Sequence, residues 1–377
     1  MAPSDQVAAL PGALFPVSFE ASRSRLKGWV TALSNRWPSV AVEEVSVGPS
    51  GEPMTILRAE APRRRALVIL VAGLHGVEGY AGSAVAEVFL RECVPGLDEG
   101  SVSVWVVHAT NPWGWMTGRK TNHDNVDLNR SFLADRSALP VNSGYSDPAI
   151  CSVFEPSRPL GWAALAARLL PLALRGRLGA LAAALTLGQY HSPQGLYHGG
   201  SEAPQAAVWL QAAFDRALDE WDELTVLDLH TGYGPKDALA VVNSRYENTP
   251  AQEWARRLDW PLVQQSGNDF YAIHGDMTDW LTLRHRQRTP AKSFWATTLE
   301  FGTWGDGTLP MLRTLAATVN ENAAWHHGTD AQKHRWGRAL RSLYAPARPR
   351  WRRAVIDQAR RLLHTIVEVR GLGRGTP

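Results

Sequence analysis

Apolar and polar positions along the chain recur with two periods, one typical of strands and the other typical of helices. Continuous apolar runs or strict alternation predict seven strands, at residues 40–47, 54–60, 66–73, 101–109, 224–230, 238–243 and 295–302. Apolar residues recur at helical spacing in 21–34 and 82–93. Strands that alternate with helices predict an α/β fold, in which a mixed sheet is covered by helices on both faces.

Residues 1–330 are expected to form one such domain, because no linker rich in Pro, Gly or Ser divides them. The segment 154–200 is predicted to be a helical insertion in this domain. Its apolar stretch, 161–188, is interrupted by Arg168 and Pro171, so we do not expect it to span a membrane. One or two amphipathic helices packed on the body are expected there, and a lid over a pocket is the alternative.

Charge is distributed unevenly along the chain. From residue 332 onward twelve Lys and Arg stand against Asp357 and Glu368, so this part carries +10 while the whole chain carries +3. Residues 331–377 are therefore predicted to form a basic, helical C-terminal extension. Such a surface can attract nucleic acid, but no recognisable binding module accompanies it, so no nucleic-acid partner is expected.

The composition, 45% hydrophobic and 20% charged residues, predicts a packed core. Cys93 and Cys151 are the only cysteines, too few for a disulfide framework or a Cys-based zinc site, which fits a reducing compartment. The first residues lack a basic segment followed by a sustained apolar stretch. We therefore expect no signal peptide, and we predict a cytoplasmic location.

Residues that can bind metal or move protons follow four of the predicted strands. His75 and Glu78 follow the third strand, a polar segment at 116–132 follows the fourth, His230 ends the fifth and Glu300 lies near the end of the seventh. Open α/β sheets bind their ligands beyond the carboxyl ends of the strands. The four segments are therefore expected to meet at one edge of one sheet.

His75, Glu78 and His230 are a suitable ligand set for a catalytic zinc ion, which takes three protein ligands and leaves one position open. His75 and Glu78 are three residues apart and can point the same way if a helix begins there. Gly76 and Gly79 are expected to let the backbone turn tightly at this corner. The sequence predicts one Zn²⁺ per chain at this corner.

A water molecule activated by such a metal needs a base. Glu300 lies in an apolar strand, where an unpaired carboxylate is costly. A glutamate paired with an arginine is the alternative, but its coincidence with the ligand set favours a catalytic role. Asp127 or Asp228 could orient a metal-binding histidine through its second nitrogen.

The polar segment supplies cations. Arg130 follows Asn129 in a stretch rich in Asn and Asp, which favours a structured loop. An arginine beside an asparagine suits a substrate carboxylate, because Arg binds it through two parallel hydrogen bonds. A second arginine nearer the metal, Arg119, could stabilise an oxyanion.

In their order and setting these residues resemble the zinc carboxypeptidase superfamily. "HGVE" at 75–78, "GRK" at 118–120 and "VDLNRSF" at 126–132 carry the resemblance, together with His230 and Glu300. It implies a roughly eight-stranded mixed sheet and zinc on the three ligands, with Asp127 supporting His75. It also implies that Glu300 promotes attack by water, that Arg119 polarises the scissile carbonyl, and that Asn129 and Arg130 hold a terminal carboxylate.

"DFYAIHGDMTDWL" resembles the segment of that superfamily that carries a mobile tyrosine, which would make Tyr271 the residue that closes over substrate. A buried core tyrosine is an equally good interpretation. The insertion and the extension are departures from well-studied members and resemble a bacterial branch known as a domain of unknown function. Histidines 191 and 198 of the insertion are expected to be exposed loop residues. Asp276, Thr278 and Phe301 are candidates for the neighbourhood of the specificity pocket.

The leading hypothesis is a zinc-dependent amide hydrolase of carboxypeptidase type, acting on a peptide with a free carboxylate. The nearest alternative is an N-acyl amino acid deacylase similar to aspartoacylase and succinylglutamate desuccinylase, which share the same motifs. The predicted helical tail, in place of a small β-rich domain, favours the peptidase. A third possibility is a peptide-binding protein that has lost catalysis.

Overall fold

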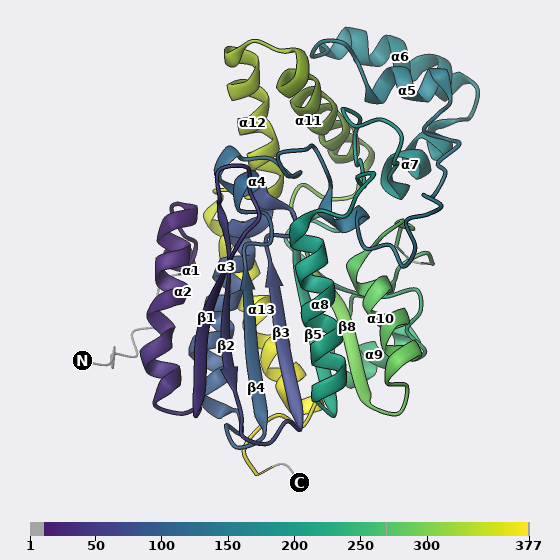
Figure 1. Ribbon diagram of the computed structural model, residues 1–377. Helices are drawn as coiled ribbons and strands as arrows, with labels where there is room; N and C mark the ends of the chain where they lie inside the picture. Colours follow the sequence, from purple (N-terminus) through teal and green to yellow (C-terminus); the bar gives the residue numbers. More distant parts are fainter. Residues whose placement is uncertain (1–10, 269, 376–377) are drawn as a thin grey trace.

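The computed structural model describes residues 11–268 and 270–375, and eight strands in this part of the chain form one mixed sheet (Figure 1). The strands are β1 Ser39–Ser46, β2 Pro53–Glu60, β3 Ala66–Ala72, β4 Val102–His108, β5 Glu223–Gly232, β6 Leu239–Asn243, β7 Val263–Gln265 and β8 Ser293–Gly302. Their order across the sheet is β1-β2-β4-β3-β5-β8-β6-β7. The predicted α/β class, with a mixed sheet of about eight strands, is confirmed.

The middle of the sheet is parallel and is flanked on both sides by antiparallel pairs, and the edge strand β7 pairs parallel with β6. The strands β4, β3, β5 and β8 run parallel to one another, whereas β1 with β2, β2 with β4, and β6 with β8 pair antiparallel. The four parallel strands therefore end at one edge. In the β5–β8 register His230 lies opposite Glu300, so the fold itself makes these two residues neighbours.

All seven strands predicted from the residues are present. The eighth, β7, has the sequence VQQ and none of its side chains is buried. Three half-exposed residues carry neither an apolar run nor an alternation, so nothing in the local sequence indicated this strand.

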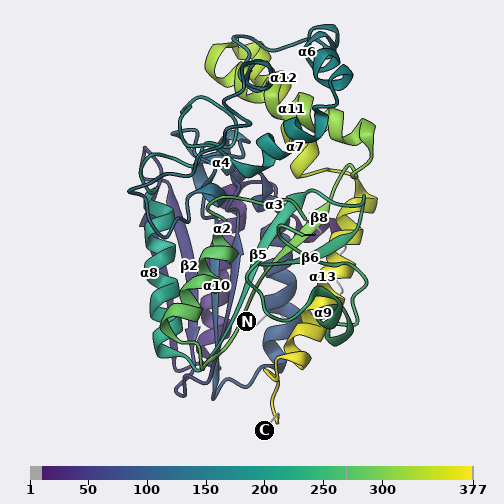
Figure 2. The ribbon, with the colours of Figure 1, turned by 90° about the vertical axis from the view of Figure 1, so that its right-hand side faces the viewer.

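Helices cover both faces of the sheet (Figure 2). One face packs against α1 Pro11–Leu14, α2 Phe19–Ser34, α3 Gly79–Val88, α9 Ala251–Arg257 and α13 Pro349–Val369. The other face packs against α8 Gln205–Glu220 and α10 Met277–Arg288. The predicted helix at 82–93 ends earlier than expected, because α3 passes into a single turn of π-helix at Phe89–Cys93.

Further helices gather above the carboxyl edge of the parallel strands (Figure 1). They are α4 Pro112–Thr117, α5 Pro148–Phe154, α6 Trp162–Leu174, α7 Leu178–Leu187, α11 Thr308–His327 and α12 Asp330–Tyr344. Helices α5, α6, α7 and α11 share an apolar cluster of their own, in which Leu165, Leu181 and Leu315 meet. The insertion is therefore packed against the body through α11. Among the described residues no single helix combines the length and the hydropathy needed to cross a bilayer.

The basic C-terminal segment packs against the sheet and pairs with acids of the body. Helix α13 buries an apolar stripe that includes Val355, Leu362 and Ile366. Outside that stripe, Arg360 binds Glu92, Arg370 binds Glu223 and Arg374 binds Glu99. Part of the uneven charge is therefore neutralised within the chain.

Candidate metal centre and active site

His75 is placed by the abrupt end of β3. Gly73 has a φ of 71°, a left-handed conformation that glycine adopts without strain, and it turns the chain out of the sheet. His75 then caps a short 3₁₀ turn, Gly76–Glu78, whose N–H of Glu78 donates to the carbonyl of His75 at 3.1 Å. This tight turn brings the two side chains together.

The two glycines of this corner have a different role from the one expected. Neither Gly76 nor Gly79 has a positive φ. A Cβ atom on Gly76 would lie 2.3 Å from the backbone of Gly114, and one on Gly79 would lie 2.1 Å from the ring of Trp115. These glycines therefore allow α4 to pack directly on the corner.

The predicted ligands His75, Glu78 and His230 lie together and are buried, and their donor atoms are within 4.8 Å of one another. Nδ1 of His75 is 2.8 Å from Oε1 of Glu78 and 3.1 Å from Nδ1 of His230. The same nitrogen of His230 is 3.2 Å from Oε2 of Glu78. Two strand ends thus supply one compact group of three ligand atoms.

Both histidines are anchored through their other nitrogen. Nε2 of His75 is 3.0 Å from Oδ1 of Asp127, and Nε2 of His230 is 2.7 Å from Oδ2 of Asp228. The sequence left open which aspartate would orient a histidine, and the structure places one behind each. A carboxylate behind a histidine fixes its ring orientation and its tautomer.

These contacts provide a test of whether the residues fit a metal ion. Each Nε2 faces a carboxylate and carries its hydrogen there, which leaves lone pairs on both Nδ1 atoms in the neutral rings. Two lone pairs that face each other at 3.1 Å, beside the Glu78 carboxylate, repel unless a proton or a metal cation lies between them. The donor set of two imidazoles and one carboxylate therefore fits a divalent cation such as zinc.

The charges around this group stabilise Glu78 and Asp127 in the ionised form. Burial opposes ionisation of Glu78, but the neighbouring His75 and His230 outweigh it and lower the pKa of Glu78 to about 2. Burial likewise opposes ionisation of Asp127, yet Lys120, His75 and Arg130 hold its pKa well below the usual range. Two carboxylates therefore remain charged at neutral pH.

Glu300 lies in β8 beside His230 and lines the same cavity. Burial, followed by the charge of Glu78, raises the pKa of Glu300 to about 8, while Lys120 and His230 act in the opposite direction. Its Oε1 accepts a hydrogen bond of 2.9 Å from the backbone N–H of Tyr233. A carboxyl group whose pKa lies near neutrality is suited to accept and return a proton.

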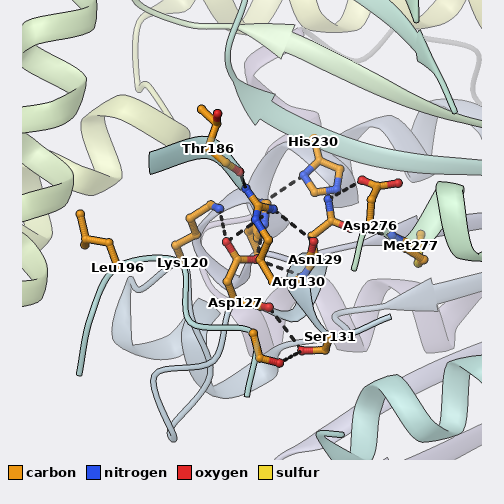
Figure 3. A network of polar contacts seen from close by, with 12 residues as sticks. Lys120, Asp127, Asn129, Arg130, Ser131, Thr186, Leu196, His230, Asp276 and Met277 are labelled. Carbon is orange, nitrogen blue, oxygen red and sulfur yellow. Dashed lines mark hydrogen bonds and ion pairs between the residues drawn. The ribbon is translucent and has the colours of Figure 1, made fainter. Parts of the chain in front are cut away.

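Lys120 was not singled out from the sequence, yet it lines the cavity and lies next to the predicted ligands. Its Nζ donates to Oδ2 of Asp127 at 2.6 Å and lies 4.3 Å from the centre of the Tyr197 ring. Figure 3 shows Lys120 turned toward Asp127, which links it to His75. Its position in the quoted motif "GRK" was the available signal, since it is the residue after Arg119.

Arg119 points elsewhere. Its Nε donates to Glu321 at 2.8 Å, and its Nη2 donates to Asn125 and Asn322 at 3.0 and 3.1 Å. The guanidinium also lies 4.6 Å from the centre of the Trp325 ring. Arg119 is not among the residues that line the cavity. A role at the reacting carbonyl would require it to leave Asn125 and these partners in α11.

Arg130 and Asn129 both line the cavity. The Nη atoms of Arg130 donate to the carbonyls of Asn129 and Thr186 at 3.1 and 2.8 Å. The side chain of Asn129 donates to Asp276 and accepts from the backbone of Met277, each at 3.0 Å, so its position is fixed (Figure 3). The guanidinium carries five N–H groups, and three of them are not engaged in these two bonds.

Tyrosines from distant parts of the chain surround the site. The predicted Tyr271 lines the cavity, stacks on Phe270 and meets Tyr233 edge-on. Burial, followed by the nearby Glu300, raises the pKa of its hydroxyl well above the usual value. Tyr197 and Tyr344 line the cavity as well. Neither was predicted, because they come from the insertion and from the end of α12, and their local sequences carry no catalytic pattern.

Of the remaining residues singled out from the sequence, some line the cavity and others do not. Asp276 and Thr278 line the cavity, as expected of residues near a specificity pocket. Phe301 does not, since its side chain lies in the main apolar core. His191 is exposed as predicted, but the prediction for His198 is wrong: it is 4% exposed, and its carbonyl accepts from the N–H of Asp127 at 2.8 Å. The insertion therefore helps to hold the loop that carries Asp127.

A family model described as "Protein of unknown function (DUF2817)" matches residues 15–358, which confirms the predicted resemblance to a domain of unknown function. No curated protein matches the chain.

Three solved structures to which the chain is similar belong to the groups that its motifs resemble. Carboxypeptidase A from Helicoverpa armigera is 14% identical, with a TM-score of 0.46, over 86% of this chain and 73% of that one. Succinylglutamate desuccinylase from Chromobacterium violaceum is 15% identical, with a TM-score of 0.37, over 81% and 72%. Murein-tripeptide amidase MpaA from Escherichia coli O157 is 16% identical, with a TM-score of 0.38, over 78% and 96%.

Proposed function

The chain belongs to the DUF2817 family, and we propose that it is a zinc-dependent hydrolase of carboxypeptidase type that cleaves an amide bond next to a free carboxylate. One observation carries the proposal. The three ligand atoms of His75, Glu78 and His230, a carboxyl group with a pKa near 8 on Glu300, and buried Arg130 all meet in one cavity. Cleavage of an amide next to a carboxylate requires a metal site, a general base and a cation that binds the carboxylate.

When bound to His75, Glu78 and His230, zinc supplies a Lewis acid that polarises a carbonyl and lowers the pKa of a water molecule. Glu300 takes a proton from the attacking water as the new C–O bond forms. It then gives that proton to the leaving nitrogen as the C–N bond breaks, so that an acid and an amine are released. Asp127 and Asp228 hold the imidazole rings in place through both steps.

Lys120 is the cation that we assign to the developing oxyanion. Its ammonium group lines the cavity and acts electrostatically on Glu300, whereas Arg119 is engaged by Glu321 and Asn322. An ammonium has three N–H groups, and only one is needed for the bond to Asp127. The others are available to a carbonyl oxygen that gains negative charge.

Asn129 and Arg130 are assigned to the substrate carboxylate, with Tyr271 closing over it. An arginine held by two backbone carbonyls and shielded from solvent is a rigid partner for an anion. Tyr271 lines the same cavity as Arg130 and Glu300, and the charges of both act on the pKa of its hydroxyl.

Removing the carboxylate partner tests this assignment. Replacing Arg130 by Met is expected to lower kcat/KM for free-acid substrates by about 100-fold, because a charge-assisted hydrogen bond contributes about 1.5–3 kcal/mol. Amidated substrates, which lack the charge, should lose much less. The matched control is Arg136→Met, since Arg136 also donates to backbone carbonyls but does not line the cavity. Equal losses on acid and amide substrates would contradict the assignment.

Zinc binding is tested by thermal unfolding. Free Zn²⁺ at 100 times its dissociation constant is expected to stabilise the folded protein by about 2.7 kcal/mol, and a chelator should reverse the effect. Replacing His75 by Gln should abolish the response, whereas His191→Gln, at an exposed position, should keep it. The measurement is the unfolding midpoint with and without Zn²⁺. An undiminished response in His75→Gln would place the metal elsewhere.

A second candidate function is an N-acyl amino acid deacylase, which would use the same residues. The observation that favours it is the apolar lining of the outer cavity, formed by residues such as Leu185, Met311 and Leu343. Mass spectrometry of products from free-acid peptides, amidated peptides and N-acyl amino acids separates the two. Binding of peptide without turnover by the zinc-loaded protein would indicate a protein that has lost catalysis.

A further inference from the structure

The cavity has an apolar roof made by segments that lie outside the sheet. Ala182 and Leu185 come from α7, Met311 and Leu315 from α11, and Leu343 from the end of α12. These helices lie above the carboxyl edge of the sheet in both views (Figures 1 and 2). The three ligands, Glu300 and Arg130 belong to the sheet and its loops, whereas the helical roof is mainly apolar and adds the polar groups of Thr186, Thr314 and Tyr344.

One end of the roof lies beside Arg130 and the other end lies beside the candidate metal ligands. At the α7 end, the carbonyl of Thr186 accepts from Arg130 at 2.8 Å. At the α12 end, the carbonyl of Tyr344 accepts from the hydroxyl of Thr231, the residue after His230, which places α12 beside the metal ligands. A substrate held by its carboxylate at Arg130, with its amide at the metal ligands, therefore extends from the α7 end of the roof toward the end of α12.

The apolar lining continues to the surface. On α7, Leu178 lies one turn before Ala182, on the same helical stripe, and both are exposed. On α11, Met311 is both 47% exposed and part of the cavity, and Leu309 beside it is 58% exposed. Apolar residues on α7 and α11 therefore extend from the cavity to the solvent-exposed surface.

Peptides and hydrocarbon chains differ in how they suit such a roof. Where a peptide that continues from the scissile bond meets the apolar side chains of this roof, its N–H and C=O groups find no hydrogen-bond partners, which is unfavourable. A hydrocarbon chain gains affinity there, by about fourfold for each methylene that is fully buried. The lining thus discriminates between the two kinds of acyl group.

The charge of the covering segment suits an anionic amphiphile. Residues 156–201 contain no Asp or Glu and four arginines, of which Arg177 is paired with Asp147. A surface of one sign raises the local concentration of ligands of the opposite sign. A molecule with one carboxylate and a long apolar tail combines the two features that this face of the molecule presents.

We propose that the acyl side of the substrate is a hydrocarbon chain, so that the protein releases an amino acid from N-acyl amino acids with medium or long chains. The inference rests on the proposed function in its deacylase form. In the reaction water attacks the acyl carbon, the C–N bond breaks, and the proton taken by Glu300 goes to the amino nitrogen. A fatty acid and a free amino acid leave, and no further reactant is needed.

The test is a series of N-acyl amino acids with acetyl, butanoyl, octanoyl and dodecanoyl chains, prepared on a panel of amino acids and assayed below micelle formation beside free-acid peptides that end in the same amino acids. We expect kcat/KM to rise at least tenfold from acetyl to dodecanoyl. The variant Met311→Gln should reduce this ratio to less than threefold. Met116→Gln is the matched control, because Met116 is also 47% exposed but does not line the cavity, and it should keep the ratio.

Two results would overturn the inference while leaving the proposed function standing: a ratio near one, or turnover of free-acid peptides in preference to every acyl chain. If the zinc-loaded enzyme cleaves none of these compounds, the proposed function fails. Chain binding is then measured by calorimetry on zinc-loaded Glu300→Gln. Affinity that rises at least tenfold from acetyl to dodecanoyl supports the apolar site even so, and equal affinities or no binding reject it.

Discussion

Replacing Glu300 by Gln is expected to lower kcat by about 10³-fold while the protein keeps its zinc. The physical reason is that Gln cannot take a proton from water, and positioned general bases contribute about 10²–10⁴-fold. Gln has nearly the shape of Glu and can still accept the hydrogen bond from the N–H of Tyr233. The loss should therefore appear in kcat, with little change in KM or in the metal content measured by mass spectrometry of the native protein.

The pH dependence of the unfolding midpoint provides an independent test of the same variant. Burial and the charge of Glu78 raise the pKa of Glu300 to about 8 in the folded, metal-free protein, above its ordinary value of 4.5. The folded state therefore binds more protons than the unfolded state between these values, so the Glu300 contribution to stability declines as pH rises from about 4.5 to 8. Gln lacks this term. The unfolding midpoint of metal-free Glu300→Gln should therefore rise relative to that of wild type as the pH increases over this range. Separately, full catalytic activity in the variant would rule out Glu300 as the base.

The second large effect is expected at Lys120 and not at Arg119. Lys120→Met should lower kcat by about 10²–10³-fold, the usual loss when one oxyanion donor is removed. Arg119→Lys keeps a charge next to Glu321, so the fold is retained and the loss should stay below about tenfold. Lys120→Arg should recover part of the activity, because it restores a donor to the cavity.

Structural damage is separated from loss of catalysis by further measurements. Lys120 binds Asp127, which in turn holds His75, so the zinc content of Lys120→Met must be shown to equal that of wild type. The unfolding midpoint of Arg119→Lys checks its contacts with Asn125 and Asn322. A larger kcat loss for Arg119→Lys than for Lys120→Met, with both proteins folded and loaded with zinc, would return the oxyanion role to Arg119.

Local sequence determined seven of the eight strands and the group of candidate metal ligands. Fully buried parallel strands such as β3 and β4 carry uninterrupted apolar runs, which are a strong local signal. Parallel strands also end at one edge of the sheet, so histidines and glutamates at the ends of different strands are expected to lie close together. For that reason His75, Glu78, His230 and Glu300 could be brought together from the sequence alone.

Only the tertiary structure decided which neighbours of these residues face the cavity. Lys120 and Arg119 are adjacent in sequence, and their directions are chosen by Asp127 on one side and by Glu321, some 200 residues away, on the other. The roof was equally hidden, because it is assembled from the insertion, α11 and the end of α12. Strand ends converge by the rules of the sheet, whereas loop side chains and covering helices are placed by long-range packing that leaves no periodic trace in the sequence.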